Sequence, residues 1–210
     1  MERILFVGAH HDDLELGMGG TVKRWTTEGK KIFAAILTNS QWSAPGGQVF
    51  RDPARVIDDC ARSAALLGFE PFHFALSDAM NLAFADAHVV KVLDLMQMTK
   101  VDTLVTIWRH DAHPAHRAAS AIAMAASRKI PNVLTVRLSW NKEPEAWNPN
   151  LYVDVSATLE HRIAALQCYG DEWERTGMLW EKYVRGTAAL HGLECGCEAA
   201  EGFEVVKLRI

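Results

Sequence analysis

Short apolar runs alternate along this chain with longer stretches in which apolar residues recur at helical spacing. The apolar runs predict buried strands over Ile4–Val7, Ile32–Leu37, Thr103–Ile107 and Val133–Leu138. Strands that alternate with helices in this way favour an α/β fold, because helices then connect the strands of a largely parallel sheet. The sequence therefore predicts an α/β domain.

Capping residues mark several of the helices between these strands. Asp52 and Pro53 are typical of an N-cap and a first helical position, and Gly68 is typical of a helix end. Further helices are expected over Asp86–Thr99, Pro114–Ser127 and Ser156–Tyr169. The polar segments 38–52 and 141–150 each follow a strand, so both are expected to border a pocket at the carboxyl edge of the sheet.

Composition limits the partners that this chain can have. Its 210 residues, 49% of them hydrophobic, suit one domain over 1–210 with a sizeable core. A formal net charge of −4 without a Lys/Arg-rich run argues against nucleic acid or an anionic membrane as the main partner. No run approaches the roughly 20 apolar residues of a membrane-spanning helix, and the N-terminal apolar run is too short for a signal peptide. We therefore expect a cytoplasmic protein with free thiols that acts on small molecules.

Two polar clusters stand out because each follows a predicted strand. The first is His10-His11-Asp12-Asp13, and the second runs from His110 through Asp111, His113 and Pro114 to His116. Neighbouring parallel strands would bring both clusters to one rim of the sheet, although about a hundred residues separate them. Zinc binds histidine nitrogen and carboxylate oxygen, and a catalytic zinc usually keeps a fourth position for water. Together the clusters suggest a metal hydrolase.

Adjacent side chains within the clusters are expected to differ in role. Asp12 and Asp13 would point in different directions, so one carboxylate can bind metal while the other acts as a general base. If Pro114 opens a helix, His113 and His116 share a face, and one can bind metal while the other contacts substrate. The simpler alternative is that the histidines form a surface helix face and that one aspartate is a helix cap.

These motifs resemble the LmbE/PIG-L family of zinc-dependent sugar N-deacetylases, whose signature begins Ala-His-Pro-Asp-Asp-Glu and continues to Gly-x-Gly-Gly. The segment from Ala9 to Thr21 follows that signature, and His113-Pro114-Ala115-His116 is similar to the family's second motif, His-Pro-Asp-His. Softer matches extend the resemblance over nearly the whole chain. The resemblance implies a single-domain, three-layer, Rossmann-like fold with a mostly parallel sheet flanked by helices.

Carried over residue by residue, the resemblance implies one zinc ion per chain, held by His10, Asp13 and His116. Asp12 would be the general base that activates zinc-bound water for attack on the amide carbonyl. A protonated His113 would stabilise the oxyanion. A site of two histidines and one aspartate can also accept another divalent metal, such as ferrous iron or cobalt.

Four further side chains fall on or beside the presumed rim, where they could stack on a sugar or hold its hydroxyl groups. These candidate substrate-binding residues are Arg51, Trp42, Asp78 and Trp140. Simple packing or solvation is the alternative for each of them.

Three positions depart from the family motifs. His11 replaces a proline, Leu14 replaces the signature glutamate, and Ala115 replaces the aspartate of the second motif. None of these positions is a matched ligand or base, but polar partners around a metal site orient its histidine ligands. Asp111 could hydrogen-bond one histidine of the second motif and supply such a partner, or it could cap a loop.

The activity that the resemblance implies is hydrolysis of an N-acyl group, most often acetyl, from a small molecule that contains an amino sugar. A zinc hydrolase of another acyl or carbamoyl bond, and an inactive binding protein that retains the metal, are the alternatives. A nucleotide-binding protein that uses Gly17, Gly19 and Gly20 is a further class, although close packing of a helix on the sheet explains these glycines better. The oligomeric state stays open, with a homo-oligomer as one outcome.

Overall fold

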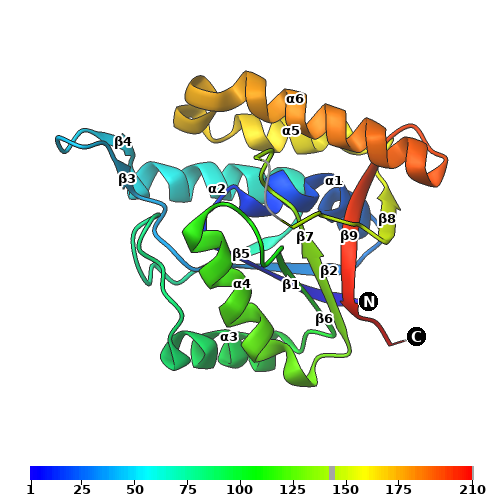
Figure 1. Ribbon diagram of the computed structural model, residues 1–210, viewed down its shortest axis with the longest axis horizontal. Coiled ribbons are helices and arrows are strands. Elements are labelled where there is room, and N and C mark those ends of the chain that lie inside the picture. Colours follow the sequence, from blue (N-terminus) through cyan, green and yellow to red (C-terminus); the bar gives the residue numbers. More distant parts are fainter. Residues whose placement is uncertain (142–144, 210) are drawn as a thin grey trace.

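A mixed, mostly parallel sheet forms the centre of the molecule, with helices on both of its faces (Figure 1). The computed structural model describes residues 1–141 and 145–209. In these residues, seven strands form one sheet in the order β5-β2-β1-β6-β7-β9-β8. The parallel strands are β1 (Arg3–Gly8), β2 (Lys31–Ile36), β5 (Glu70–His73), β6 (Thr103–Ile107) and β7 (Asn132–Val136). The last strand, β9 (Ala200–Lys207), is antiparallel both to β7 and to β8 (Leu151–Asp154).

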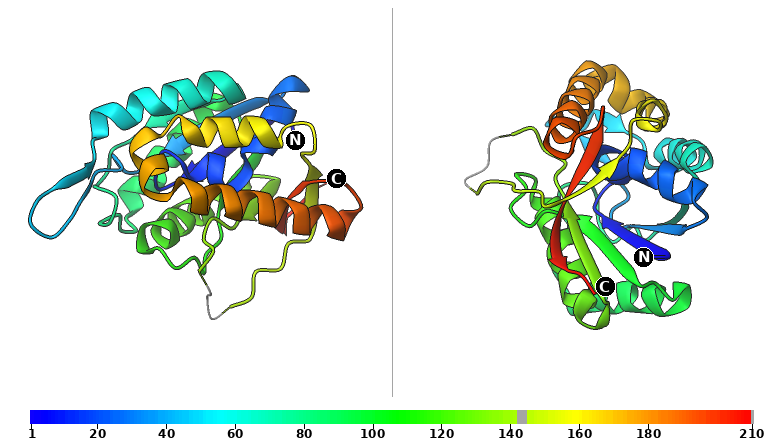
Figure 2. Two further views of the ribbon diagram at one scale, coloured as in Figure 1. Left: turned by 90° about the horizontal axis from the view of Figure 1, so that it is seen from above. Right: turned by 90° about the vertical axis from the view of Figure 1, so that its right-hand side faces the viewer.

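The helices form the outer layers of a single-domain α/β fold, as expected. One face of the sheet is covered by α1 (Asp13–Thr27), α2 (Pro53–Leu67) and α5 (Leu159–Gln167), and the long helix α6 (Gly170–Cys195) packs beside them. The other face is covered by α3 (Asp86–Thr99) and α4 (Pro114–Ala126), which ends in a 3₁₀ turn at Ser127–Lys129. Figure 2 shows the same layers from two further sides.

The four predicted strands are confirmed within two residues at each end. The capping signals of α2 are also confirmed. Asp52 accepts a hydrogen bond from the Ala54 N–H, and Gly68 takes the left-handed conformation with a φ of 91°. The predicted start of α5 is wrong, because Ser156 bonds to Asp154 Oδ1 through both its N–H and its hydroxyl. These bonds form a turn, so that the helix begins only at Leu159.

The pairing of β1 with β6 places the two polar clusters side by side. These strands are neighbours with Val7 opposite Thr106, and each cluster begins a few residues beyond its strand. Because the strands are parallel, both clusters emerge at the same carboxyl edge of the sheet. The two clusters, about a hundred residues apart in the sequence, were expected to lie at one rim of the sheet, and the contact between His10 and His116 confirms this.

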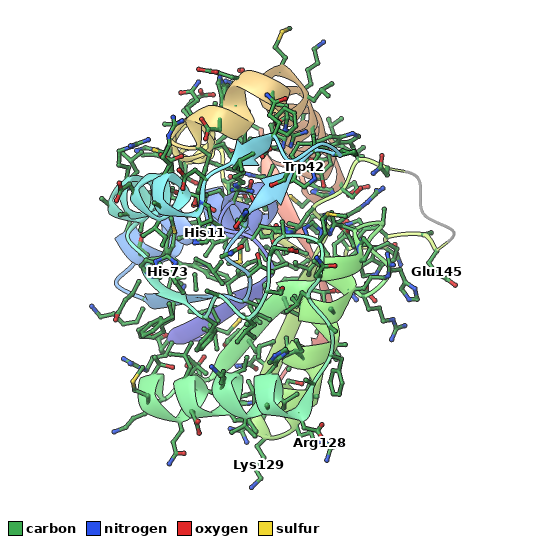
Figure 3. The ribbon with its side chains drawn as sticks, turned by 90° about the vertical axis from the view of Figure 1, so that its left-hand side faces the viewer. His11, Trp42, His73, Arg128, Lys129 and Glu145 are labelled. Atoms are coloured by element: carbon green, nitrogen blue, oxygen red, sulfur yellow. The ribbon has the colours of Figure 1, made fainter. Side chains whose placement is uncertain are left out.

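A small two-stranded ribbon lies in segment 38–52 and projects from the main body (Figure 1). Its strands are β3 (Trp42–Ser43) and β4 (Val49–Arg51), which pair antiparallel. The Trp42 and Phe50 rings pack at a centroid distance of 4.8 Å, and Figure 3 shows Trp42 on this ribbon. Arg51, the last residue of β4, is buried, unlike the exposed tip of the ribbon. The ribbon thus forms one wall beside the carboxyl edge of the sheet, and Asn141, which begins the other expected segment, lines the same cavity. Residues 142–144 of that segment lie outside the described residues.

The glycines of α1 explain how that helix packs. A Cβ atom on Gly17 would lie 2.7 Å from Val136 Cγ2 in β7, and one on Gly20 would lie 2.9 Å from the Val155 side chain. Such distances are too short for non-bonded carbon atoms, so only glycine permits this approach. Close packing of the helix, rather than a nucleotide loop, therefore accounts for these glycines. No helix in the described parts of the chain is long and apolar enough to cross a membrane.

Two glycines of α6 give a matched test of a second close approach, between that helix and the segment that follows it. A Cβ on Gly192 would lie 2.7 Å from the Cys197 carbonyl oxygen and 2.8 Å from that of Glu198, whereas a Cβ on Gly186 would meet nothing within 4 Å. Gly192→Ala should lower the free energy of unfolding by about 1–3 kcal/mol. Gly186→Ala should raise it by up to about 1 kcal/mol, since alanine favours a helix. Urea unfolding measures both changes, and equal effects of the two substitutions would contradict this packing.

Candidate metal centre

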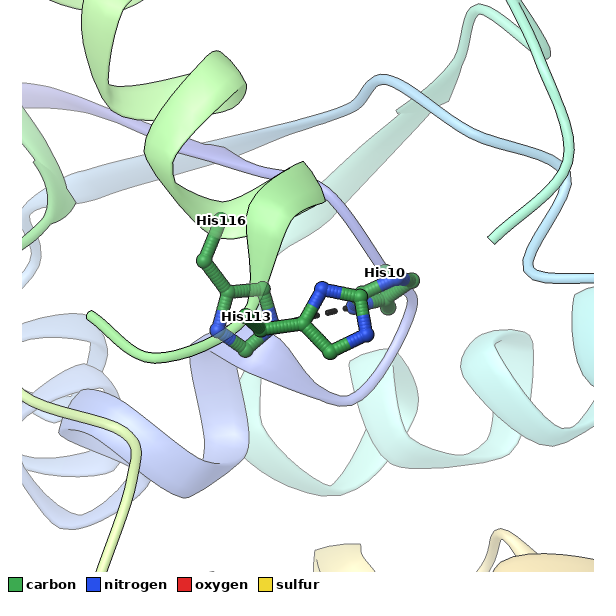
Figure 4. Close-up of side chains that lie close together, drawn as sticks. All are labelled: His10, His113 and His116. Carbon is green, nitrogen blue, oxygen red and sulfur yellow. Dashed lines mark hydrogen bonds between the residues drawn. The ribbon is translucent and has the colours of Figure 1, made fainter. Parts of the chain in front are cut away.

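Two histidines from the distant clusters meet at the carboxyl edge of the sheet. His10 Nδ1 lies 3.0 Å from His116 Nε2, and Figure 4 shows His10, His113 and His116 gathered together. His10 belongs to the turn after β1, and His116 lies in the first turn of α4, which Pro114 opens as predicted. Potential ligand atoms of these three histidines lie within 4.8 Å of one another, as do those of His10, Asp12 and Asp13.

The carboxylate of Asp13 ties this arrangement together. Its Oδ2 atom accepts hydrogen bonds from the backbone N–H groups of Ala9 and His10, at 2.7 and 2.8 Å. Its Oδ1 atom lies 3.4 Å from His10 Nδ1 and 3.2 Å from His116 Nε2. One oxygen therefore holds the turn that carries His10, and the other faces both imidazoles.

The three atoms His10 Nδ1, Asp13 Oδ1 and His116 Nε2 fit a metal ion. They form a triangle with edges of 3.0, 3.2 and 3.4 Å. In a tetrahedral zinc site with bonds near 2.0–2.1 Å, two ligand atoms are about 3.3 Å apart. Two nitrogens and one carboxylate oxygen are also ligands that zinc accepts. The described side chains can therefore hold the metal that the resemblance implies, through the predicted residues.

Hydrogen bonds from the far side of each imidazole aim its free nitrogen at the centre. His10 Nε2–H donates to the carbonyl oxygen of Ala79 at 2.9 Å, and His116 Nδ1–H donates to Asp111 Oδ1 at 2.9 Å. Since both acceptors are oxygens without a proton, the neutral form of each imidazole has its lone pair on His10 Nδ1 or His116 Nε2, facing the centre. Asp111 thus orients a histidine, and it also accepts the backbone N–H of His113 at 2.8 Å, as a loop cap does.

The buried Asp13 carboxylate is stabilised by positive charge on the groups beside it. Burial alone would raise the pKa of Asp13, but the neighbouring His116 and His10 outweigh it and hold that pKa well below its ordinary range. Burial alone would lower the pKa of His116, yet Asp13 and the hydrogen bond to Asp111 raise it to about 10. A proton on His116 or a divalent cation between the same atoms can supply the positive charge that this buried carboxylate needs.

The neighbouring Asp12 faces a different partner, as the sequence predicts. Its Oδ2 atom lies 3.1 Å from Arg51 Nη2, and both side chains are buried. The Arg51 guanidinium also lies over the Tyr169 ring, with 5.9 Å to the ring centroid. Arg51 Nε has no hydrogen-bond partner among the described residues. Arg51, for which the sequence predicts substrate binding, is therefore the ion-pair partner of the predicted base.

His113 differs from the protonated imidazole that the resemblance implies. Its Nδ1 atom accepts the backbone N–H of Ala115 at 3.2 Å and so caps α4. Burial, together with the nearby His10 and His116, lowers the pKa of His113 to about 4. The imidazole is therefore neutral near pH 7, and its hydrogen lies on Nε2. It remains a hydrogen-bond donor but carries no charge of its own.

A cavity of about 410 Å³ opens in front of these side chains, within the range usual for small-molecule sites. It contains three of the four predicted substrate-binding residues, namely Arg51, Trp42 and Trp140. Asp78 is not among the residues that line it. Its carboxylate instead accepts hydrogen bonds from Met80 and Asn81 and shapes the turn beside the cavity. The cavity also contains three side chains of α6 that were not predicted as site residues, namely Glu172, Arg175 and Trp180.

Sequence reasoning also missed a buried acid beneath the centre. Glu15 is fully buried, and its Oε1 accepts a hydrogen bond from the Ser63 hydroxyl and lies 2.8 Å from Tyr169 Oη. Tyr169 Oη also lies 2.6 Å from the His11 carbonyl oxygen, to which its only hydrogen can be donated. Burial raises the pKa of Glu15 to about 8, so a protonated Glu15 can donate to Tyr169. One signal in the sequence could have indicated a buried acid. Glu15 stands between Leu14 and Leu16 in an otherwise apolar, glycine-rich stretch.

Comparisons with known proteins agree with this architecture. The sequence profile of a family described as "PIG-L: GlcNAc-PI de-N-acetylase" matches residues 5–127, which include both clusters. A curated relative, the diacetylchitobiose deacetylase of Thermococcus kodakarensis, is 24% identical over 98% of this chain and 84% of its own length.

Solved structures share the fold over the full chain. The conserved protein TT1542 from Thermus thermophilus has a TM-score of 0.83 at 22% identity, covering 100% of this chain and 97% of its own. GalB, the 4-carboxy-2-hydroxymuconate hydratase of Pseudomonas putida KT2440, has a TM-score of 0.78 at 19% identity, covering 100% and 98%. Since a hydratase shares this fold, the fold alone does not specify the reaction.

The raised pKa of Glu15 predicts how stability depends on pH. The unfolded chain ionises Glu15 near 4.5, whereas the folded protein keeps its proton up to about pH 8. The contribution to stability is therefore complete below pH 4.5 and is lost as the pH rises to 8, by up to about 1.4 kcal/mol per pH unit. Glu15→Gln keeps a neutral side chain of the same shape, so it should gain stability relative to the native protein between pH 5 and pH 8.

Urea unfolding of both proteins at the two pH values measures this difference. Glu174→Gln, at an exposed position on α6, is the matched control and should follow the native protein. A parallel pH dependence for Glu15→Gln and the native protein would mean that Glu15 is ionised in the fold.

Proposed function

Because this chain belongs to the PIG-L family of GlcNAc-PI de-N-acetylases, we propose that it is a zinc-dependent N-deacetylase of a small molecule that contains an amino sugar. The observation that carries this proposal is the triangle of His10, Asp13 and His116 with the carboxylate of Asp12 beside it. The diacetylchitobiose deacetylase that this chain resembles over most of its length supports the choice of substrate class. We assign the activity to one domain over residues 1–210.

His10 Nδ1, Asp13 Oδ1 and His116 Nε2 would hold the metal, and Asp111 and the Ala79 carbonyl would orient the two imidazoles. A divalent cation bound there lowers the pKa of a water molecule and polarises a carbonyl group. Zinc is the metal that the family resemblance implies, and the same donor set accepts iron or cobalt.

The remaining chemistry falls to three side chains. Asp12 accepts the proton of the attacking water at Oδ1, since its Oδ2 is held by Arg51. The Nε2–H of His113 donates a hydrogen bond to the oxyanion that forms at the former carbonyl oxygen. The proton held on Asp12 then passes to the leaving nitrogen, so that water and the amide become acetate and an amine.

The cavity supports a ligand with both an apolar face and hydroxyl groups. Trp42 and Trp140 offer flat surfaces on which a sugar ring can stack, and Trp140 stands 47% exposed at the mouth. Deeper in, the buried Nε–H of Arg51 can donate to a hydroxyl or carbonyl oxygen of the ligand. A pocket of this kind suits an amino sugar better than a purely apolar amide.

Two other functions use the same atoms and stay as alternatives. The centre could hydrolyse another acyl or carbamoyl bond, which product analysis would reveal. An inactive protein that only binds metal and ligand is the other alternative. The buried pair of Asp12 and Arg51 favours the enzyme, because a binding site gains nothing evident from an aspartate held at the edge of the metal centre.

Asp12→Asn tests the proposal, because it removes the base while keeping the shape of the side chain. Turnover should fall by at least about a hundredfold, with the metal content unchanged. Acetate released from a panel of N-acetylated mono- and disaccharides measures turnover, and mass spectrometry measures bound metal. Asp94→Asn, on the exposed side of α3, is the matched control and should retain full turnover.

Two results would count against this assignment. Undiminished turnover in Asp12→Asn would exclude Asp12 as the base. A native protein that binds metal but releases acetate from no member of the panel would reject the proposed substrate class.

A further inference from the structure

A chain of hydrogen bonds runs along the carboxyl edge of the sheet beside the metal centre. His11 follows β1, Ser40 follows β2 and His73 ends β5, and these three strands are neighbours. His11 Nδ1 lies 2.6 Å from Ser40 Oγ, and His11 Nε2 lies 3.0 Å from His73 Nδ1. Figure 3 shows His11 and His73 close together. The chain thus links Ser40, which lines the cavity, through the buried His11 to the exposed His73.

Ser40 has a backbone conformation that a residue with a Cβ atom rarely adopts. Its φ is 58°, in the left-handed region that favours glycine, and the residue is fully buried. Such a conformation persists only where the surrounding structure enforces it, and it is often found at functional sites. Two further non-glycine residues of the described chain, Ala75 and Lys100, also have positive φ. Lys100 ends α3, where this conformation is usual.

The contacts of Ser40 show what its conformation secures. Its Oγ atom accepts the backbone N–H of His11 at 3.2 Å, and its own N–H donates to Thr38 Oγ1 at 3.0 Å. His11 stands between His10 and Asp12, so this contact fixes the peptide backbone that joins the candidate ligand to the candidate base. A proline, which the family signature has at position 11, offers neither an N–H nor an imidazole. The bonding at this position is therefore particular to the histidine of this chain.

The geometry points to Ser40 as a positioning residue, braced by His11 and His73, that holds the backbone of residues 10–12 in the metal-binding arrangement. This inference rests on the proposed function, because it concerns the same metal centre. Ser40 acts through the backbone of His11 and needs no contact with the metal or the reacting atoms. Glycine would adopt this conformation without strain, but it would lack the hydroxyl group. Both the backbone N–H and the imidazole of His11 contact that hydroxyl in this protein.

Ser40→Gly separates the two contributions of this residue. Glycine adopts a φ of 58° readily, which offsets part of the cost of leaving the buried N–H of His11 without its acceptor, so the urea midpoint should change little. Loss of the hydroxyl should raise the zinc dissociation constant by about 10–100-fold, as expected when a group that orients a metal site is removed. The kcat should fall while KM stays within about threefold. Competition with a chromophoric zinc chelator measures the dissociation constant.

Ala75→Gly is the matched control, because Ala75 also has a positive φ, of 49°, but does not line the cavity. It should be at least as stable as the native protein, with unchanged zinc affinity and kcat. His73→Phe removes the exposed end of the chain and keeps a ring there. It should weaken zinc binding less than Ser40→Gly, and adding it to Ser40→Gly should cause little further loss, because the brace is already broken.

A zinc dissociation constant in Ser40→Gly within twofold of the native value would overturn the positioning role. Equal weakening in Ala75→Gly would overturn it as well, since the effect would then follow the backbone and not the hydroxyl. A native protein that binds no zinc would instead overturn the proposed metal centre, and this role with it.

Discussion

The site depends on the hydrogen bonds that the Asp13 carboxylate accepts from the backbone turn after β1. One carboxylate oxygen accepts the N–H groups of Ala9 and His10, and the other faces the imidazoles of His10 and His116. Asp13 therefore joins the end of β1 to the start of α4, two segments that only the parallel pairing of β1 with β6 brings together. Without that pairing the two histidines would not meet, and without the carboxylate their imidazoles, although aimed by Ala79 and Asp111, would face one another with no acidic partner between them.

Three acids close in sequence acquire different chemistry from their surroundings. Asp13 lies between two imidazoles, which lower its pKa, while Glu15 lies against Tyr169 and Ser63, where burial raises its pKa. Asp12 pairs with the guanidinium of Arg51. Acids whose surroundings differ in this way are what a hydrolytic site needs, because one must bind a cation while another exchanges a proton. The short turn before α1 thus separates the roles of residues that are nearly adjacent.

The sequence allowed prediction of those features that have local signals, such as the apolar runs of β1, β2, β6 and β7 and the caps of α2. The candidate ligand triangle was expected from the family motifs, and the structure brings its atoms within 3.4 Å of one another. Other features depend on partners that are distant in the chain. The pairing of Arg51 with Asp12 has no spacing that a sequence pattern could reveal, and the neutral state of His113 follows from burial. The positive φ of Ser40 is equally hidden, because serine is not a residue type that predicts it.

The metal content of the purified protein tests the central claim, that two clusters a hundred residues apart build one metal centre. Mass spectrometry would compare the native chain with His10→Ala, His116→Ala and the control His110→Ala, which alters the second cluster outside the triangle. We predict one zinc per chain in the native protein and in His110→Ala, and none in the other two variants. Full retention of zinc by either His10→Ala or His116→Ala would contradict a shared centre.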